Sequence, residues 1–198
     1  GFEMADAIYE SGEEENNVDV AARFYSYIDD FEYAFSVFHG NSREASLGVD
    51  LGTGEIIPYY ATVSQVGLEI QYLIEGWAWK LEVIHRDGML ENSIDLGGQK
   101  VALTQAGPAL TLADSESYFA TVGGFEYTQV GIFESRWDLG WVVEHLYDSR
   151  QEDASFGAFE HDLLLANRWV VNDEADSELL AGILYDYEYE DYSLSLEG

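Results

Sequence analysis

The stretch Val66 to Arg86, VGLEIQYLIEGWAWKLEVIHR, decides the fold that this sequence predicts. In both halves of the stretch, apolar side chains occupy every second position, and charged or small residues fill most of the positions between them. Because successive side chains of a strand point to opposite faces, each half has one apolar and one mixed, charged face. The two-residue break at Glu75-Gly76 predicts an antiparallel hairpin, with Trp77 and Trp79 beside its turn.

The same two-faced pattern predicts three further hairpins along the chain. Their strands are expected at Val18 to Ile28 and Phe31 to His39, Tyr118 to Gly131 and Trp137 to Asp148, and His161 to Asn172 and Glu178 to Glu188. Additional strands are expected at Phe2 to Glu10 and at Tyr192 to Glu197. The fold class is therefore all-β, an antiparallel up-and-down meander of about ten or more strands.

The connections between the expected strands alternate in length. Short ones are expected at 29–30, 75–76, 132–136 and 173–177, and long, loop-like ones at 11–17, 40–62, 87–117 and 149–160. In a meander every short turn then falls at one end and every long connection at the other. Bacterial outer-membrane barrels show this asymmetry, whereas a soluble barrel has no physical need for it. The pattern favours a transmembrane β-barrel.

The two faces of the expected strands differ in chemistry. One face collects apolar side chains: Leu68, Ile70, Tyr72, Trp77, Trp79, Leu81, Phe125, Tyr127, Leu139, Trp141, Val143, Leu163, Leu165, Trp169, Ile183 and Tyr185. The other collects the candidate lumen-facing charges: Arg23, Glu32, Glu69, Lys80, Glu82, Arg86, Glu126, Asp138, Glu144 and Arg168. In a membrane barrel the apolar face contacts lipid, and an aromatic girdle is expected near the short turns from Trp77, Trp79, Tyr127 and Trp137.

A soluble barrel would instead point the apolar face inward, and periodicity alone does not say which face is wet. The charges also permit two interpretations. In a narrow barrel they form a network that plugs the interior, and in a wider one they line an aqueous path that favours cations.

Composition bounds the function classes. The 198 residues are expected to form a single domain, either a whole β-barrel or a fragment of a larger one, and the Gly1 start is taken as that of a mature or trimmed chain. With 39 acidic residues against 8 basic ones, a formal charge of −31, nucleic-acid binding is excluded because phosphate contacts need Lys and Arg. The absence of cysteine excludes disulfides and thiolate sites.

Four stretches of the chain resemble uncharacterised, porin-like outer-membrane β-barrel proteins of Gram-negative bacteria. They are FEYAFSVFHGNSRE (31–44), IPYYATVSQVGLEIQYLIEGWAWKLEVIHR (57–86), GGFEYTQVGIFESRWDLGWVVEHLYDSR (123–150) and VNDEADSELLAGILYD (171–186). The resemblance implies an outer-membrane location and no defined substrate or catalytic residue. The expected partners are the lipid bilayer and lipopolysaccharide, with a homo-oligomer or a larger outer-membrane assembly as an open expectation.

Other candidate chemistry is weak. Asp50 to Glu55, DLGTGE, looks like a phosphate loop of actin-like ATPases but lacks that family's other motifs. The four histidines show no metal-binding spacing, and His39 and His85 are expected at one level, in an interfacial or loop-anchoring role. No cofactor is expected, apart from weak Ca²⁺ or Mg²⁺ binding by acidic runs: Asp29-Asp30, Glu13 to Glu15 and Glu188 to Asp191.

The sequence thus predicts an outer-membrane β-barrel with a structural or porin-like role, that is, cation-favouring passive diffusion without catalysis. Glu82 and Glu144 could serve acid–base chemistry, but no nucleophile or cleft motif accompanies them. The alternative is a soluble acidic β-protein, either a ligand-binding barrel or an extracellular assembly subunit.

Overall fold

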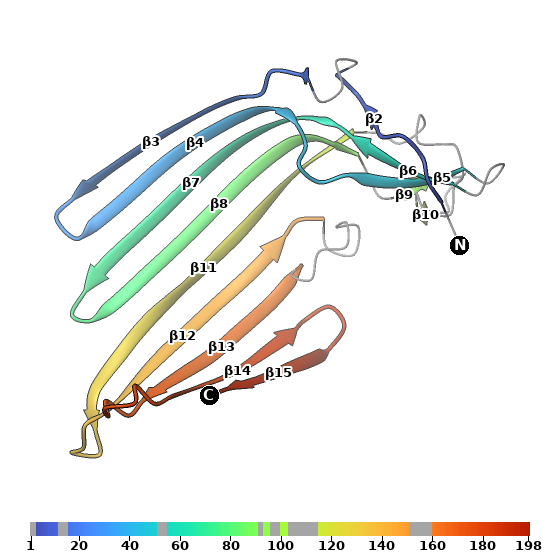
Figure 1. Cartoon of the computed structure of the whole chain (residues 1–198). Coiled ribbons are helices and arrows are strands. Elements are labelled where there is room, and N and C mark those ends of the chain that lie inside the picture. The colour runs from blue at the N-terminus through green and yellow to red at the C-terminus, as the bar shows by residue number, and fades with distance from the viewer. Residues whose placement is uncertain are drawn as a thin grey trace.

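A computed structural model describes residues 3–11, 16–50, 55–90, 93–95, 100–102, 115–150 and 160–198. The regular elements of this described part are β-strands, most of them in one long curved sheet (Figure 1). The expected all-β class is confirmed.

The main sheet is a nine-stranded antiparallel meander in the order β15-β14-β13-β12-β11-β8-β7-β4-β3, with β3 and β15 at its edges. Its strands are β3 (Val20–Ile28), β4 (Phe31–Asn41), β7 (Thr62–Ile74), β8 (Trp77–Leu90), β11 (Ser115–Ile132), β12 (Trp137–Asp148), β13 (His161–Val170), β14 (Glu178–Asp186) and β15 (Asp191–Glu197). The predicted meander and its four hairpins are confirmed.

Tight turns join the hairpins at one end of the sheet. At Glu75-Gly76 both residues have positive φ, 48° and 85°, as the two-residue turn that matches strand twist requires. The other expected short connections lie at the same end (Figure 1). The turn at 187–190 is also short but lies at the opposite end, where the Asp186 carboxylate accepts the backbone N–H groups of Glu188 and Tyr189.

The prediction of long loops is wrong in part, because two of the stretches contain strands. The stretch 40–62 holds the ends of β4 and β7 and also β5 (Ser46–Asp50) and β6 (Glu55–Tyr60), and 87–117 holds β9 (Ser93–Asp95) and β10 (Lys100–Ala102). Glycine and proline suggested loops there, but EIIPYY is an apolar, strand-forming run that pairs on both edges. The expected first strand is split into β1 (Glu3–Met4) and β2 (Ile8–Tyr9), both parallel to β6.

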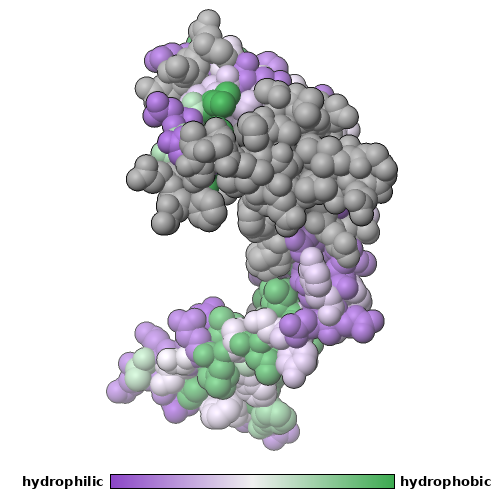
Figure 2. Space-filling view, turned by 90° about the vertical axis from the view of Figure 1, so that its right-hand side faces the viewer, coloured by the Kyte–Doolittle hydropathy of each residue, from purple (hydrophilic) through white to green (hydrophobic). Residues whose placement is uncertain are grey.

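The register of the main sheet separates two faces. Directly paired residues share a face, so all sixteen side chains of the apolar set lie on one face, called here the apolar face. The ten candidate charges lie together on the other, the charged face. In the space-filling view, hydrophobic side chains of the described residues gather in the lower part of the molecule (Figure 2).

The buried core is small and lies away from the apolar face. It consists of Ala61, Val63, Met89 and Tyr118, near the end with the long connections. Many large apolar side chains of the sheet are exposed instead, among them Phe24 at 59%, Val66 at 53% and Trp79 at 47%. Within the described residues no second layer covers the apolar face.

Candidate functional site

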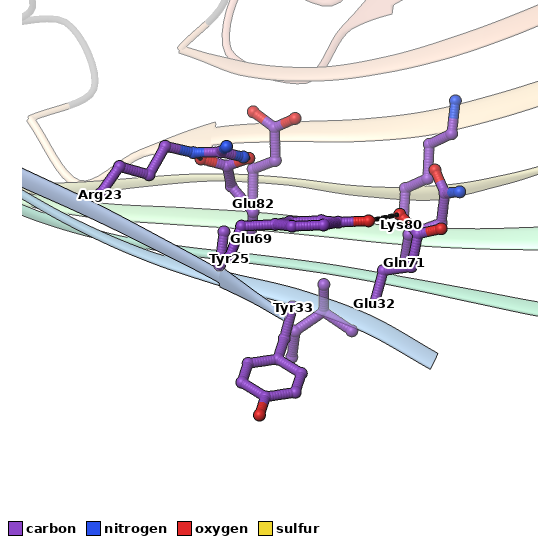
Figure 3. A pocket seen from close by; sticks show the side chains of 10 residues that line it. Arg23, Tyr25, Glu32, Tyr33, Glu69, Gln71, Lys80 and Glu82 are labelled. Atoms are coloured by element: carbon purple, nitrogen blue, oxygen red, sulfur yellow. Dashed lines mark hydrogen bonds and ion pairs between the residues drawn. The ribbon is translucent and has the colours of Figure 1, made fainter. Parts of the chain in front are cut away.

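The charged face is the first candidate site, and neighbouring strands of the sheet build it. In Figure 3, Arg23, Tyr25, Glu32, Glu69, Gln71, Lys80 and Glu82 project on one side of the strands, whereas Tyr33 points to the other. Several of these side chains line a hollow of about 140 Å³. The fainter ribbons of the second half of the sheet cross the view on the same side as the charges.

Ion pairs connect strands across this face. Arg23 on β3 reaches Glu69 on β7, with 2.5 Å between Nη2 and Oε2, so the pair spans the intervening strand β4. It can do so because β4 presents only Ala34 and Ser36 between them. Lys80 on β8 contacts Glu126 on β11, with 2.5 Å between Nζ and Oε1.

A third pair joins Arg168 on β13 to Glu178 on β14. All three pairs are partly exposed, so solvent screens them and each contributes little to stability. Their effect is to position the charges rather than to hold the sheet together.

A second group of charges lies nearer the long connections. The Arg86 guanidinium donates to the Gln65 side chain at 2.8 Å and lies 4.0 Å from a Glu44 carboxylate oxygen. Arg150 pairs with Asp148 at 2.6 Å and stacks over the buried Tyr118 ring, 3.6 Å from its centroid. These arginines pack against the small core, so they also anchor the long connections to the sheet.

The charged face keeps an excess of negative charge. Arg23, Lys80, Arg86 and Arg168 each have an acidic partner, whereas Glu82 and Glu144 join no ion pair within the described residues. Glu32 accepts the Tyr25 hydroxyl, and the remaining candidate, Asp138, accepts Gly131 N–H and the Asn172 amide. The resulting net negative charge of this face attracts cations.

The predicted aromatic residues lie at the tight-turn end of the apolar face. Trp77 stacks on Tyr127 with 4.3 Å between ring centroids and on Trp79 with 5.9 Å, and Phe125 packs against both tryptophans. Trp137 opens β12 beside the next tight turn and is 42% exposed. The structure thus brings three of the four predicted girdle residues into contact and adds Phe125 to the cluster.

All four histidines lie on the apolar face toward its other end. His39 and His85 were expected at about one level where strands enter the long connections, and the register places them on this face together with His145 and His161. The rings of His145 and His161 are 5.3 Å apart and are surrounded by Tyr147 and Tyr187. On each of four strands, a histidine lies eight positions from an aromatic residue near the tight turns, so the two residues enclose a run of nine. The pairs are Phe31 and His39, Trp77 and His85, Trp137 and His145, and Trp169 and His161. This spacing could have been found in the sequence.

Acidic groups gather at the same end of β13 and β14. Asp162 is 1% exposed, its Oδ2 has no hydrogen-bond partner, and its cross-strand neighbour is Asp186. Burial is the main cause that raises the pKa of Glu160 above its usual value, and the nearby carboxylates of Asp162, Asp186 and Glu188 add to it. No group of three or more potential ligands within the described residues is arranged to hold a metal ion.

The acidic runs predicted as weak cation sites have different outcomes. Asp29-Asp30 lie in a tight turn, and Glu188 to Asp191 lie in the turn at the opposite end of the sheet and at the start of β15, so the two runs form no common site. Glu13 to Glu15 and most of the phosphate-loop-like stretch, 51–54, lie outside the described residues. Glu82 and Glu144 lie on strands β8 and β12 of the same face, separated by β11.

Comparisons with protein-family models, curated proteins and solved structures found no match for this chain. Within the described residues, no helix has the length and apolar character to cross a bilayer.

Proposed function

We propose that this chain forms the wall of a transmembrane β-barrel in the bacterial outer membrane, with a structural or porin-like role and no catalysis. The apolar face contacts lipid, and the charged face lines a water-filled interior through which small cations pass passively. Lipid and lipopolysaccharide are the surrounding partners.

The exposed apolar face carries this proposal. All nine strands place large exposed apolar side chains on it, namely Phe24, Phe35, Val37, Val66, Tyr72, Ile74, Trp79, Leu81, Phe119, Trp137, Leu165, Leu179, Tyr192, Leu194 and Leu196. A soluble monomer rarely exposes so continuous an apolar surface. In a bilayer the same surface is solvated by lipid, while the backbone groups between the strands are paired.

The stagger of the sheet supports closure into a barrel. Phe31, the first residue of β4, is linked through the directly paired residues Tyr72, Trp79 and Phe125 to Val143 on β12. Val143 lies six residues beyond Trp137, the residue of β12 next to its tight turn. Six residues rise roughly 20 Å, and four strand spacings span roughly 19 Å. If the tight turns mark one membrane surface, the strands tilt by roughly 45°, close to the 35–45° that barrels use.

The spacing of aromatic residues and histidines supports a membrane of ordinary thickness. The run from Trp77 to His85 covers nine residues, and the three equivalent runs have the same length. A tilted transmembrane strand needs about 9–11 residues. The stacked tryptophans and Tyr127 would then lie in one interfacial region, where amphipathic rings are enriched.

Reconstitution tests the proposal. The purified chain is refolded with and without detergent, and its size distribution, β-sheet content and partition into lipid vesicles are measured. We expect a folded species only in detergent or vesicles, and cation-favouring conductance in planar bilayers. A folded, monodisperse chain in detergent-free buffer that leaves vesicles untouched would instead favour a soluble acidic β-protein.

A further inference from the structure

The hollow of about 140 Å³ on the charged face lies where β3, β4, β7 and β8 run side by side. Its lining carries three carboxylates and two basic groups. Both basic groups already have acidic partners, because Arg23 contacts Glu69 and Lys80 contacts Glu126 from β11. The hollow therefore keeps an excess of negative charge.

Glu82 is the lining carboxylate with a like charge directly opposite it. Its cross-strand partner is Glu69, and like charges in direct opposition destabilise a sheet. Arg23 compensates Glu69, whereas Glu82 joins no ion pair within the described residues. Glu82 is exposed, so a cation from solution can approach it. A cation bound beside Glu82 would relieve the repulsion.

The ring of Tyr25 gives the hollow a second kind of surface. Tyr25 is 50% exposed, and its cross-strand partner on β4 is the small residue Ala34. The Tyr25 hydroxyl donates to Glu32 Oε2 at 3.0 Å, which fixes the position of the ring. Figure 3 shows the ring edge-on, with the Glu82 and Lys80 side chains rising on one side of it. The face of an aromatic ring attracts cations, and aromatic faces recognise quaternary ammonium groups.

Arg23 is engaged by a carboxylate rather than by the ring. Its Cζ atom lies 5.8 Å from the Tyr25 ring centroid, near the outer limit of about 6 Å for a cation–π contact. Its Nε and Nη2 atoms both donate to Glu69, at 3.2 and 2.5 Å. The uncompensated groups of the hollow are therefore an aromatic ring and a nearby carboxylate, and both favour a positively charged ligand.

We propose that this hollow binds a small organic cation of the alkylammonium class, with the charged group between the Glu82 carboxylate and the Tyr25 ring. The assignment rests on the proposed function in one respect, that the charged face is open to water. It also deepens that function. Net negative charge alone attracts any cation, whereas an aromatic face beside a carboxylate selects alkylammonium ions among the cations that pass.

NMR spectroscopy of the tyrosine rings tests the site. The full chain, with ring-labelled tyrosine, is folded in a maltoside detergent, which carries neither charge nor ammonium group. Tetramethylammonium chloride then replaces potassium chloride at constant ionic strength, so that general screening stays constant. The chain has 14 tyrosines, and the signal that is missing in Tyr25→Leu identifies Tyr25. We expect a saturable shift of this signal and a nuclear Overhauser effect between the Tyr25 ring protons and the methyl protons of tetramethylammonium.

Matched controls separate the hollow from the rest of the acidic surface. Glu82→Gln should weaken the affinity for tetramethylammonium by about tenfold, because the nearest uncompensated charge is lost. Glu144→Gln removes an unpaired carboxylate of the same face on β12, two strands away from β8, and should bind like the wild type. Tyr27 lies on the same face of β3, 68% exposed and outside the lining, so its signal should show no saturable shift. Circular dichroism checks that each variant retains its sheet.

The outcomes distinguish this assignment from the proposed function. If the Tyr25 and Tyr27 signals shift alike without saturation, or if Glu82→Gln binds as tightly as the wild type, the hollow is not a site for organic cations. Conductance in planar bilayers is measured separately. A chain that conducts potassium but shows no response of Tyr25 keeps the porin-like role and loses the site. A chain whose Tyr25 signal saturates but which carries no current keeps the site and loses the porin-like role.

Discussion

Single carboxylates at the strand ends differ in what surrounds them. Asp162 is enclosed and faces another aspartate, whereas Asp173 is exposed and receives two hydrogen bonds from Ser177, one from the backbone N–H and one from the hydroxyl, both at 2.9 Å. The Ser177 backbone N–H is the main cause that holds the pKa of Asp173 below its usual value, and the Ser177 hydroxyl is the next. The turn before β14 is therefore stabilised by an ionised side chain.

Replacing Ser177 by Ala should raise the pKa of Asp173 part of the way toward its usual value, because the hydroxyl donor is lost and the backbone donor remains. Carboxyl ¹³C NMR over an acid titration measures it. Because the pKa of Asp173 is depressed in the folded chain, its contribution to stability is present above the unfolded pKa and disappears as the pH falls through the folded one. An unchanged midpoint in the variant would show that the hydroxyl plays no part.

The sequence predicted which charges share a face but not which of them meet. Alternation placed Arg23 and Glu69 on one face, and that follows from period two alone. Their contact depends on the register of three strands and on the small side chains of Ala34 and Ser36 between them. The register is determined by turn geometry and packing, which a single sequence does not specify to the residue.

The hairpins were the most predictable elements. The alternation is long in β7 and β8, and Glu75-Gly76 suits the tight turn between them. The short strands β5 and β6 were missed because glycine and proline stand beside them, and five or six residues give too little periodicity to outweigh those signals.

Two adjacent glycines in β11 test the packing of this element. A Cβ atom built on Gly124 would lie 2.0 Å from the Val143 backbone oxygen of β12, whereas one on Gly123 would meet a Leu81 methyl group at 3.4 Å. Gly124→Ala should therefore separate the two strands and destabilise the fold by about 1–3 kcal/mol. Gly123→Ala is the control and should change the urea midpoint little. Equal midpoints for the two variants would contradict this packing.

The orientation of β8 is tested by a pair of neighbouring substitutions. Leu81 is 38% exposed on the apolar face, and Glu82 follows it on the charged face. If the apolar face meets lipid, Leu81→Arg should reduce vesicle insertion at a cost of about 2–4 kcal/mol near the bilayer centre, whereas Glu82→Arg should insert normally. Insertion yields are compared by protease protection, and equal yields would show that Leu81 does not face lipid.

At the scale of the whole molecule, the paired cations leave an acidic charged face. The double variant Glu82→Gln/Glu144→Gln removes two carboxylates that join no ion pair within the described residues. Its cation preference, measured as the reversal potential across a salt gradient in planar bilayers, should be smaller than that of the wild type. Glu126→Gln is not a suitable control, because it also releases Lys80. A double variant with unchanged selectivity would indicate that these carboxylates do not line the path.

The overall architecture was predictable to the level of a meander. Alternating short and long connections gave the order of the strands, because each tight turn forces neighbours to pair. Local patterns contain no comparable signal for what lies beside β3 and β15, since the pairing of an edge depends on contacts distant in sequence.

The number of strands has a consequence for those two edges. In a meander of nine strands the first and the last run in the same direction, so β3 and β15 both run toward the tight turns. A direct seam between them would be a parallel pair in an otherwise antiparallel sheet. A ring that is antiparallel throughout has an even number of strands, so it must add an odd number to these nine. If this sheet closes into a barrel, parity therefore restricts how β3 and β15 can be joined.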